Sequence, residues 1–176
     1  METIHSQNQQ AQAAYEAGQY NKAALLYENN ASILFGAGDI LTAAEMANNS
    51  SVAYLQAGEI NDSLRMVTGT ADIFFEAGDN KRHAMALGNH ASALEASGKL
   101  HDALDMYQSS AALLKEKNEI ELYTHVLKRI SSLQLRTGSH LGAVASMQSA
   151  LNNSKTLSMR EKLIKNLLRL PFRLQR

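Results

Sequence analysis

Histidine has the widest chemical range of any residue type in this chain, because imidazole can bind a metal or move a proton near neutral pH. His83 and His90 are seven residues apart, so on a helix they share a face but lie about 10 Å apart along the axis. One metal ion cannot span that distance, and residues 85–89 contain no third ligand. His101 and two following aspartates come just after a turn, where carboxylates favour a helix N-terminus without doing chemistry. We interpret these histidines as structural or surface residues.

Recognisable catalytic motifs are missing from the sequence. It contains no HExxH pair, no GxxxxGK phosphate loop and no GxSxG nucleophile turn. It also contains no cysteine, which removes disulfides and thiolate metal sites from consideration. We therefore predict no catalytic residue, no metal and no cofactor, and an enzyme is the least favoured class of function.

Charge is balanced overall but unevenly distributed. The 176 residues include 17 Lys and Arg and 17 Asp and Glu. From Leu157 onward, six basic residues oppose only Glu161, a net charge of +5, so the remaining chain carries −5. An acidic body lacks the clustered basic face that phosphate binding requires, which argues against a nucleic-acid partner. The polar N-terminus does not resemble a signal peptide, and no stretch approaches the roughly 20 apolar residues of a membrane span. We expect a cytoplasmic protein.

A glycine recurs every twenty residues, and this period organises the elements of the chain. Asn118 occupies the one position of the series without glycine. Glycine and asparagine are the residues that best tolerate the left-handed backbone found where helices end. About sixteen residues with apolar side chains at helical spacing separate the turns. The pattern predicts an all-α chain of stacked helices. The turn glycines are Gly18, Gly38, Gly58, Gly78, Gly98 and Gly138.

The residues five, nine and thirteen positions after each turn lie on one helical face. In the first copy they are Ala23, Tyr27 and Ala31, a small, large, small order that the copies after Gly58 and Gly98 repeat. Small side chains allow a neighbouring helix to approach closely, and the larger one fills the space beside them. The sequence therefore predicts the buried face of each helix.

The segments that begin at Gly18 and Gly98 share further residues. In both, glycine is followed by a polar residue, Tyr or Leu, two polar residues, Ala, and Tyr four residues later. This resembles the second helix of a tetratricopeptide (TPR) repeat, and the preceding helices supply that family's small residue seven positions before the turn. The resemblance covers residues 5–153. The unit is forty residues long, not the commoner thirty-four, which is similar to lengthened TPR variants and to the helical repeats of NSF-attachment proteins. The small residues are Ala11, Ser51, Ala91 and Ser131.

The resemblance implies an all-α, right-handed superhelix (a TPR-like solenoid) that forms a single domain over residues 1–176. Four helix pairs are expected at about 5–36, 40–76, 80–116 and 120–153, followed by a capping helix and tail at 158–176. Since stacked repeats need a solvated outer helix, the last helix would cap the stack and end at Pro171. Its apolar side would consist of Leu163, Ile164, Leu167 and Leu168.

In the TPR architecture, the first helix of each pair lines a concave surface that holds a peptide of another protein. The matching positions here are polar in the early pairs and cationic in the last. Asn and Gln both donate and accept hydrogen bonds, which suits a peptide backbone, whereas Lys and Arg suit a carboxylate. The candidate groove residues are Asn8, Gln12, Asn48, Asn49, Val52, Asn89, Ser92, His125, Lys128, Arg129 and Ser132, with Gln9 beside the first of them.

TPR modules that bind a chaperone's C-terminal carboxylate use two Asn, two Lys and one Arg. Asn89 and Arg129 match this clamp, and His125 stands where a Lys is expected. Asn48 and Val52 occupy the other two positions, so two of the five agree. The resemblance implies a protein partner, either an extended peptide or a helix, with an acidic or C-terminal peptide as one candidate. A solvated polar surface is the alternative.

The tail admits three interpretations. It caps the stack; or it lies on an anionic membrane with Leu170, Phe172 and Leu174 inserted; or its last five residues contact a second copy. Capping is preferred because a terminal solvating helix is required in any case. For the whole chain we predict a non-catalytic scaffold or adaptor that binds a partner in its groove. The alternative is a self-assembling structural module that forms homo-oligomers through its outer faces or its C-terminal tail. Fold alone identifies no partner.

Overall fold

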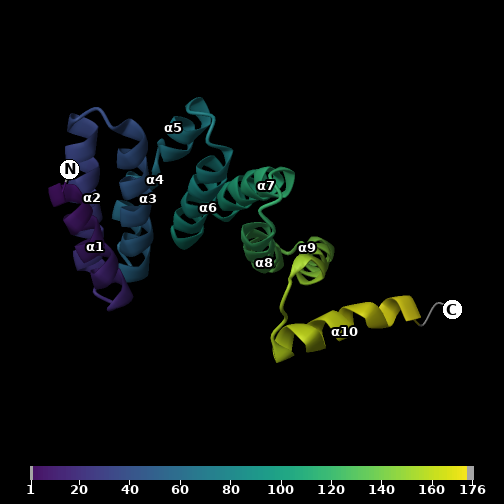
Figure 1. Cartoon of the computed structure of the whole chain (residues 1–176). Helices are drawn as coiled ribbons and strands as arrows, with labels where there is room; N and C mark the ends of the chain where they lie inside the picture. Colours follow the sequence, from purple (N-terminus) through teal and green to yellow (C-terminus); the bar gives the residue numbers. More distant parts are fainter. Residues whose placement is uncertain (1, 174–176) are drawn as a thin grey trace. The chain divides into compact units, whose positions relative to one another are not determined.

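The computed structural model describes the backbone of residues 2–173 and the side chains of residues 6–168. Helices account for nearly all of this range, and no strand occurs within it (Figure 1). The predicted all-α repeat is therefore confirmed. Leu174 and the side chains of Leu170 and Phe172 lie outside the described residues. The helices are α1 (Glu2–Glu16), α2 (Tyr20–Gly36), α3 (Ile40–Ala57), α4 (Ile60–Val67), α5 (Thr70–Glu76), α6 (Asn80–Ala96), α7 (Leu100–Glu116), α8 (Ile120–Arg136), α9 (His140–Asn153) and α10 (Met159–Arg173).

The turns between helices explain the twenty-residue period. Gly58 has a φ of +85°, its N–H donates to the carbonyl of Leu55 at 3.2 Å, and the next N–H donates to the carbonyl of Tyr54. Asn118 adopts the same left-handed conformation with a φ of +58°, and its N–H donates to the carbonyl of Lys115 at 3.2 Å. It is the one residue other than glycine with positive φ among those described. The turn geometry thus selects Gly or Asn at each position.

Two compact units can be distinguished along the chain, residues 1–106 and residues 107–176, with the boundary inside α7. In the first unit, α2 packs between α1 and α3, and α4 and α6 also pack together. In the second, α8 packs against α9 and α9 against α10. Whether the helix pairs form one continuous superhelical domain stays a prediction.

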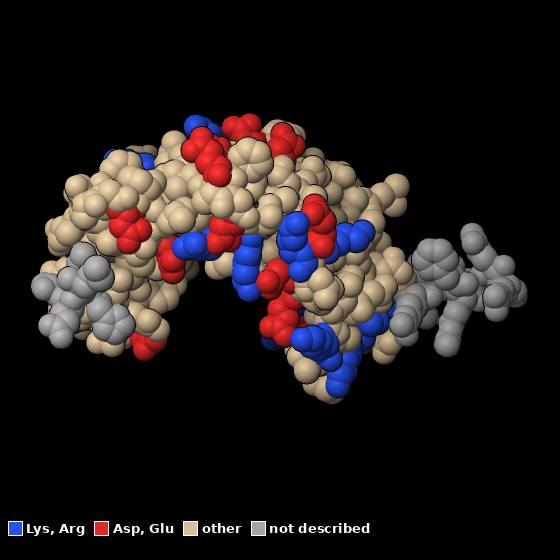
Figure 2. All heavy atoms as spheres, turned by 45° about the horizontal axis from the view of Figure 1, so that its top comes forward, with Lys and Arg blue, Asp and Glu red and all other residues tan. Residues whose placement is uncertain are grey.

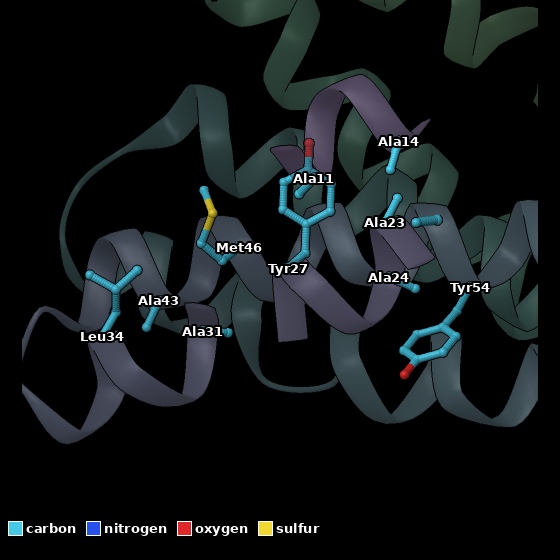
Figure 3. Close-up of a cluster of buried hydrophobic side chains, with 11 residues drawn as sticks. Ala11, Ala14, Ala23, Ala24, Tyr27, Ala31, Leu34, Ala43, Met46 and Tyr54 are labelled. Atoms are coloured by element: carbon cyan, nitrogen blue, oxygen red, sulfur yellow. The ribbon is translucent and has the colours of Figure 1, made fainter. Parts of the chain in front are cut away.

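The core of the first unit is built mainly from alanine. Tyr27 and Leu34 fill the space between α1, α2 and α3, and alanines surround them (Figure 3). The small residues bring the backbones close enough for side-chain hydroxyls to bond a neighbouring helix: Ser50 donates to the carbonyl of Ala24 at 2.9 Å. The cluster confirms the predicted small, large, small face. Its buried members are Ala11, Ala14, Ala23, Ala24, Tyr27, Ala31, Leu34, Ala43, Met46, Ala53 and Tyr54.

The small residue seven positions before each turn is used in two ways. In the second and fourth pairs it is serine: Ser51 donates to the carbonyl of Ser63 at 2.8 Å, and Ser131 donates to the carbonyl of Ala143 at 2.7 Å. In the first and third pairs the same position holds Ala11 and Ala91, both fully buried. Contacts between paired helices thus alternate between alanine packing and a serine hydrogen bond.

The helix expected across residues 60–76 is interrupted. Thr68 takes an extended conformation and Gly69 has a φ of +81°, which separates α4 from α5. Two hydroxyls satisfy carbonyls near the break: Thr68 donates to Leu64 at 2.7 Å and Thr70 donates to Val67 at 2.8 Å. The twenty-residue period gave no warning of this break, because Gly69 lies outside the series.

The last helix differs from expectation in two respects. First, α10 continues two residues beyond Pro171. Proline removes one hydrogen bond and its ring crowds the carbonyl four residues earlier, but here both effects fall near the end of the helix, which continues to Arg173. Second, the expected burial of its apolar side is not found: Leu163 is 62% exposed and Leu167 54% exposed. Only Leu168 of the expected capping residues is half-buried toward α9.

Candidate peptide-binding site

The first unit brings three of the predicted groove residues together. Gln12 of α1 and Asn49 and Val52 of α3 line one hollow of about 440 Å³. Tyr15, Glu16 and Tyr27 complete its lining. Helices α1 and α3 supply the predicted residues and α2 supplies Tyr27, so the hollow forms where these three helices pack together.

This hollow combines aromatic surface with amide and carboxylate groups. Gln12 donates a hydrogen bond to Glu16 at 2.9 Å. Tyr15 packs edge-to-face against Tyr20, with ring centroids 5.3 Å apart. Burial raises the pKa of Tyr27, and the negative charge of Glu16 raises it further, so its phenol stays protonated. The hollow can therefore enclose an apolar or cationic side chain of a ligand and bond a peptide backbone at its rim.

Other predicted groove residues of this unit hold the protein together. Asn48 is buried, donates to the carbonyl of Ala44 at 3.0 Å, and accepts from Asn89 at 3.2 Å, which ties α3 to α6. Asn8 accepts from the buried Asn30 at 2.6 Å. Ser92 donates to a carbonyl of its own helix. These residues were selected from the TPR pattern as groove residues, but their hydrogen bonds are made inside the chain.

In the second unit, His125 and Lys128 share a hollow of about 240 Å³ between α8 and residues 153–156. Partial loss of hydration lowers the pKa of His125, and the nearby charges of Arg129 and Lys128 lower it further. The histidine is therefore largely neutral at pH 7 and can act as a hydrogen-bond donor or acceptor, not as a fixed cation.

Lys128 already has a carboxylate partner. Its ammonium donates to Glu161 of α10 at 2.5 Å. That bond, together with the backbone and hydroxyl of Ser158, lowers the pKa of Glu161 to about 2. The group predicted to bind a partner's carboxylate thus binds one from the same chain.

Arg129 and Ser132 stand apart from this hollow. Arg129 donates to the hydroxyl of Tyr107 at 3.2 Å, and its guanidinium lies 6.0 Å from the centre of that ring. Ser132 is exposed and does not line the hollow. The structure therefore groups His125 with Lys128 and directs Arg129 elsewhere.

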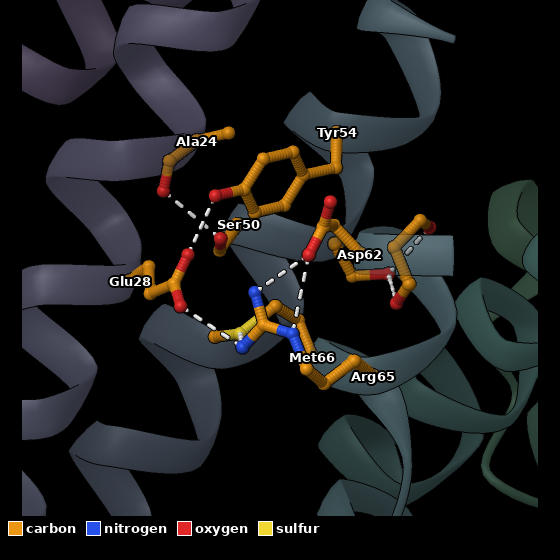
Figure 4. A network of polar contacts seen from close by, with 9 residues as sticks. Ala24, Glu28, Ser50, Tyr54, Asp62, Arg65 and Met66 are labelled. Atoms are coloured by element: carbon orange, nitrogen blue, oxygen red, sulfur yellow. Dashed lines mark hydrogen bonds and ion pairs between the residues drawn. The ribbon is translucent and has the colours of Figure 1, made fainter. Parts of the chain in front are cut away.

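Sequence reasoning missed a polar network that joins three helices (Figure 4). Tyr54 of α3 donates to Glu28 of α2 at 2.5 Å, and Arg65 of α4 pairs with Glu28 and with Asp62, each at 2.9 Å. Hydrogen bonding to Arg65 lowers the pKa of Glu28, whereas burial and Glu28 raise the pKa of Tyr54 to about 12. The spacing of residues in the sequence does not predict this network, because its members come from three different helices.

Beside that network lies a second cleft that was not predicted, of about 480 Å³. We call it the α2–α5 cleft. Four alanines, three of them buried, line it together with Phe35, Met66 and Ile73. The off-register Gly69 was the signal that could have revealed it, since the break between α4 and α5 helps to shape its wall. The lining residues are Glu28, Ala31, Ser32, Phe35, Gly36, Ala43, Ala44, Ala47, Arg65, Met66, Thr68, Thr70 and Ile73.

Acidic and basic side chains lie next to one another at several places on the face shown in Figure 2, and large areas carry neither. In the described part of the chain, no three metal-ligating side chains gather at one point. His83 instead packs against the ring of Phe75, 5.4 Å between centroids, and burial lowers the pKa of His90. None of the described helices is both long enough and apolar enough to cross a membrane.

Comparison with known proteins places the fold. No family model matches the chain, and no curated protein is a recognisable relative. Among solved structures, BtubC (BKLC) from P. vanneervenii is similar with a TM-score of 0.71 and 15% identity, covering 90% of this chain and 68% of that one. TPR-like repeats of a putative kinesin light chain from Podosopora anserina give 0.57 and 13%, covering 96% and 93%. The TPR2AB domain of yeast Sti1, in complex with pHSP90, gives 0.53 and 13%, covering 97% and 84%.

These similarities define the class of protein: the chain has the all-α, TPR-like helical-repeat fold. The identities of 13–15% support the fold and no more. The predicted resemblance to TPR repeats is thereby confirmed, and the partner has to be argued from the chain's own residues.

Proposed function

We propose that this chain is a non-catalytic scaffold that binds a peptide or helix of another protein on the surface formed by the first helices of its pairs. One observation carries the proposal: Gln12, Asn49 and Val52, chosen by position in the repeat, converge on one hollow. The solved complex of the Sti1 domain with pHSP90 supports a protein partner for this fold. A cytoplasmic location is part of the proposal.

The hollow of the first unit would anchor one side chain of the partner. Tyr15 and Tyr27 offer a wide contact area at a low cost in side-chain entropy, and Val52 adds apolar surface. Asn49 and Gln12 can bond the partner's backbone on either side. Because packed helices preform these groups, binding requires little ordering of the scaffold.

In the second unit, an acidic group of the partner would bind at His125 and Lys128. It would have to replace Glu161, because Lys128 is occupied in the free protein. Such an exchange keeps the ammonium of Lys128 paired, so its cost is set by the bonds that Glu161 gives up to Lys128 and Ser158. The cationic hollow is therefore proposed as a secondary contact and the tyrosine-lined hollow as the anchor.

The test is a selection of displayed peptides on the folded full-length chain, followed by affinity measurements on the selected peptides. Asn49→Ala combined with Val52→Lys should weaken binding at least about tenfold, which is the loss of a modest hot spot. Gln56→Ala, on an exposed position of α3 outside the hollow, serves as the matched control. Failure to select any peptide, or equal affinity for both variants, would refute the proposal.

A further inference from the structure

Helix α10 contacts its unit mainly through charged side chains. Glu161 bonds Lys128 of α8, and the ammonium of Lys165 bonds the carbonyl of Leu151 in α9 at 2.9 Å. These two residues and Leu168 follow a spacing of four and three, so they share one face. An amphipathic helix normally buries its apolar face, whereas α10 leaves most of its large apolar side chains exposed.

The outward side of α10 carries a stripe of apolar side chains, Met159, Leu163 and Leu167, each four residues from the next. They are 81%, 62% and 54% exposed. Ile164 lies next to the stripe and is 38% exposed. A row of large apolar residues at this spacing is the pattern by which a helix docks in a groove of a partner.

The first unit offers a groove of matching character that nothing in the described chain fills. Four alanines line the α2–α5 cleft, and their small side chains let a helix approach the backbone closely. Phe35 stands at its edge, 58% exposed, and Met66 supplies a side chain that adapts to varied shapes. The cleft is lined by none of the predicted groove residues, so its use is independent of the peptide-binding surface.

Charge identifies the occupant. The first unit contains five Lys and Arg and thirteen Asp and Glu, a net charge of −8. The second contains twelve Lys and Arg and four Asp and Glu, a net charge of +8. Each copy thus carries a charge that attracts the opposite unit of another copy, and such attraction accelerates and orients encounter. An unrelated acidic or anionic partner would be attracted by the positive charge of the second unit, but it would leave the negative charge of the first unit without a role.

We propose that α10 of one copy docks its apolar stripe into the α2–α5 cleft of a second copy. Because donor and acceptor surfaces differ, the contact is head-to-tail and repeats from copy to copy into open chains or a ring. One helix in one cleft is a small interface, and small interfaces are weak and transient. Assembly should therefore depend on protein concentration and should weaken as salt screens the charges.

The experiment is sedimentation velocity and light scattering on the full chain over about a hundredfold range of concentration. Wild type should increase in mass with concentration, and less so at high salt. Leu163→Glu with Leu167→Glu disables the stripe, and Ser32→Lys with Phe35→Lys disables the cleft; all four positions are exposed, so the fold should be retained, as checked by circular dichroism. Each variant alone should be monomeric. Leu141→Glu and Phe75→Glu, at exposed apolar positions outside both surfaces, should assemble like wild type.

Mixing the two disabled variants gives the decisive result. Each retains one intact surface, so a one-to-one mixture should form heterodimers and nothing larger. A symmetric contact between two α10 helices predicts no recovery on mixing and would overturn the proposal. So would a wild type that stays monomeric at every concentration, or vesicles of anionic lipid that bind the monomer through the same leucines. None of these outcomes bears on peptide binding by the Gln12 hollow, which is measured separately.

Discussion

At the scale of single residues, charged and hydroxyl groups form many of the contacts that join neighbouring helices in this chain. Alanine-rich faces bury little apolar area per residue, and the hydrophobic gain scales with that area. Polar contacts between neighbouring helices compensate: Tyr54, Glu28 and Arg65 join three helices, and Ser51 bonds the backbone of the next. Such contacts also fix the register of one helix against another, because each bond has a required geometry.

Asn118 provides a simple test of the turn geometry at the end of α7. Its φ of +58° is unfavourable for side chains other than Asn and Gly. Asn118→Ala should lower the free energy of unfolding by about 1–2 kcal/mol, whereas Asn118→Gly should change it by less than about 0.5 kcal/mol. Asn21→Ala, inside α2, is the control and should be neutral or slightly stabilising. Urea denaturation measures all three, and a neutral Asn118→Ala would mean that the turn adopts another conformation.

The Glu161–Lys128 pair predicts a pH dependence. The pKa of the Glu161 carboxyl is about 2 in the folded protein, against an ordinary value of 4.5. A carboxyl whose pKa is lowered by folding stabilises the folded state at pH values above its unfolded-state pKa. The contribution of Glu161 to stability is therefore complete above about pH 4.5 and is lost as the pH falls through 2. Wild type should therefore exceed Glu161→Gln in stability at pH 7, and the difference should vanish near pH 2. Glu121→Gln, whose pair with Lys155 is exposed, should show a smaller difference. A constant difference across pH would contradict the assignment.

At the scale of elements, the sequence predicted what depends on local chemistry. Helices α2, α5 and α7 end two residues before Gly38, Gly78 and Asn118, because a left-handed turn residue can be recognised by type alone. Helix α9 ends differently, since the residue after Asn153 is extended. The α4–α5 break and the orientation of α10 could not be predicted in this way. A helix with both an apolar and a charged side can pack through either, and α10 packs through Glu161 and Lys165 because Lys128 and a free carbonyl are within their reach.

The break at Gly69 should be sensitive to substitution. Nothing lies within 4 Å of a Cβ added there, so only the backbone conformation, φ +81°, resists a side chain. Gly69→Ala should cost about 1–2 kcal/mol of unfolding free energy. Gly36→Ala has equally open surroundings but helical φ, and should be neutral or stabilising by up to about 1 kcal/mol. If thermal melts show the two variants to be equally stable, residues 67–70 form a continuous helix in solution.

At the scale of the whole molecule, the question is whether 176 residues behave as one cooperative domain or two units. Repeat proteins gain stability from each helix pair and from its nearest neighbours only, so damage in one place spreads weakly. Repeat position selected Gln12, Asn49 and Val52 from the sequence alone, and these three residues line one hollow of the first unit. It could not tell that Asn48 would be buried or that Lys128 would be paired, because these depend on side chains from other helices.

Cavity-forming substitutions in each unit distinguish the two cases. Phe74 in the first unit and Leu133 in the second are almost completely buried. Replacing either with Ala should destabilise its surroundings by about 2–5 kcal/mol, because packed neighbours cannot fill the space. If the units unfold separately, Leu133→Ala should raise amide hydrogen exchange in α8 and α9 and leave α1 to α3 near wild type, while Phe74→Ala should do the reverse. Val144→Ala, at a partly exposed position of α9, controls for substitution in the second unit. Equal loss of protection throughout the chain after either substitution would instead establish a single cooperative domain, since one unfolding event would then expose every helix.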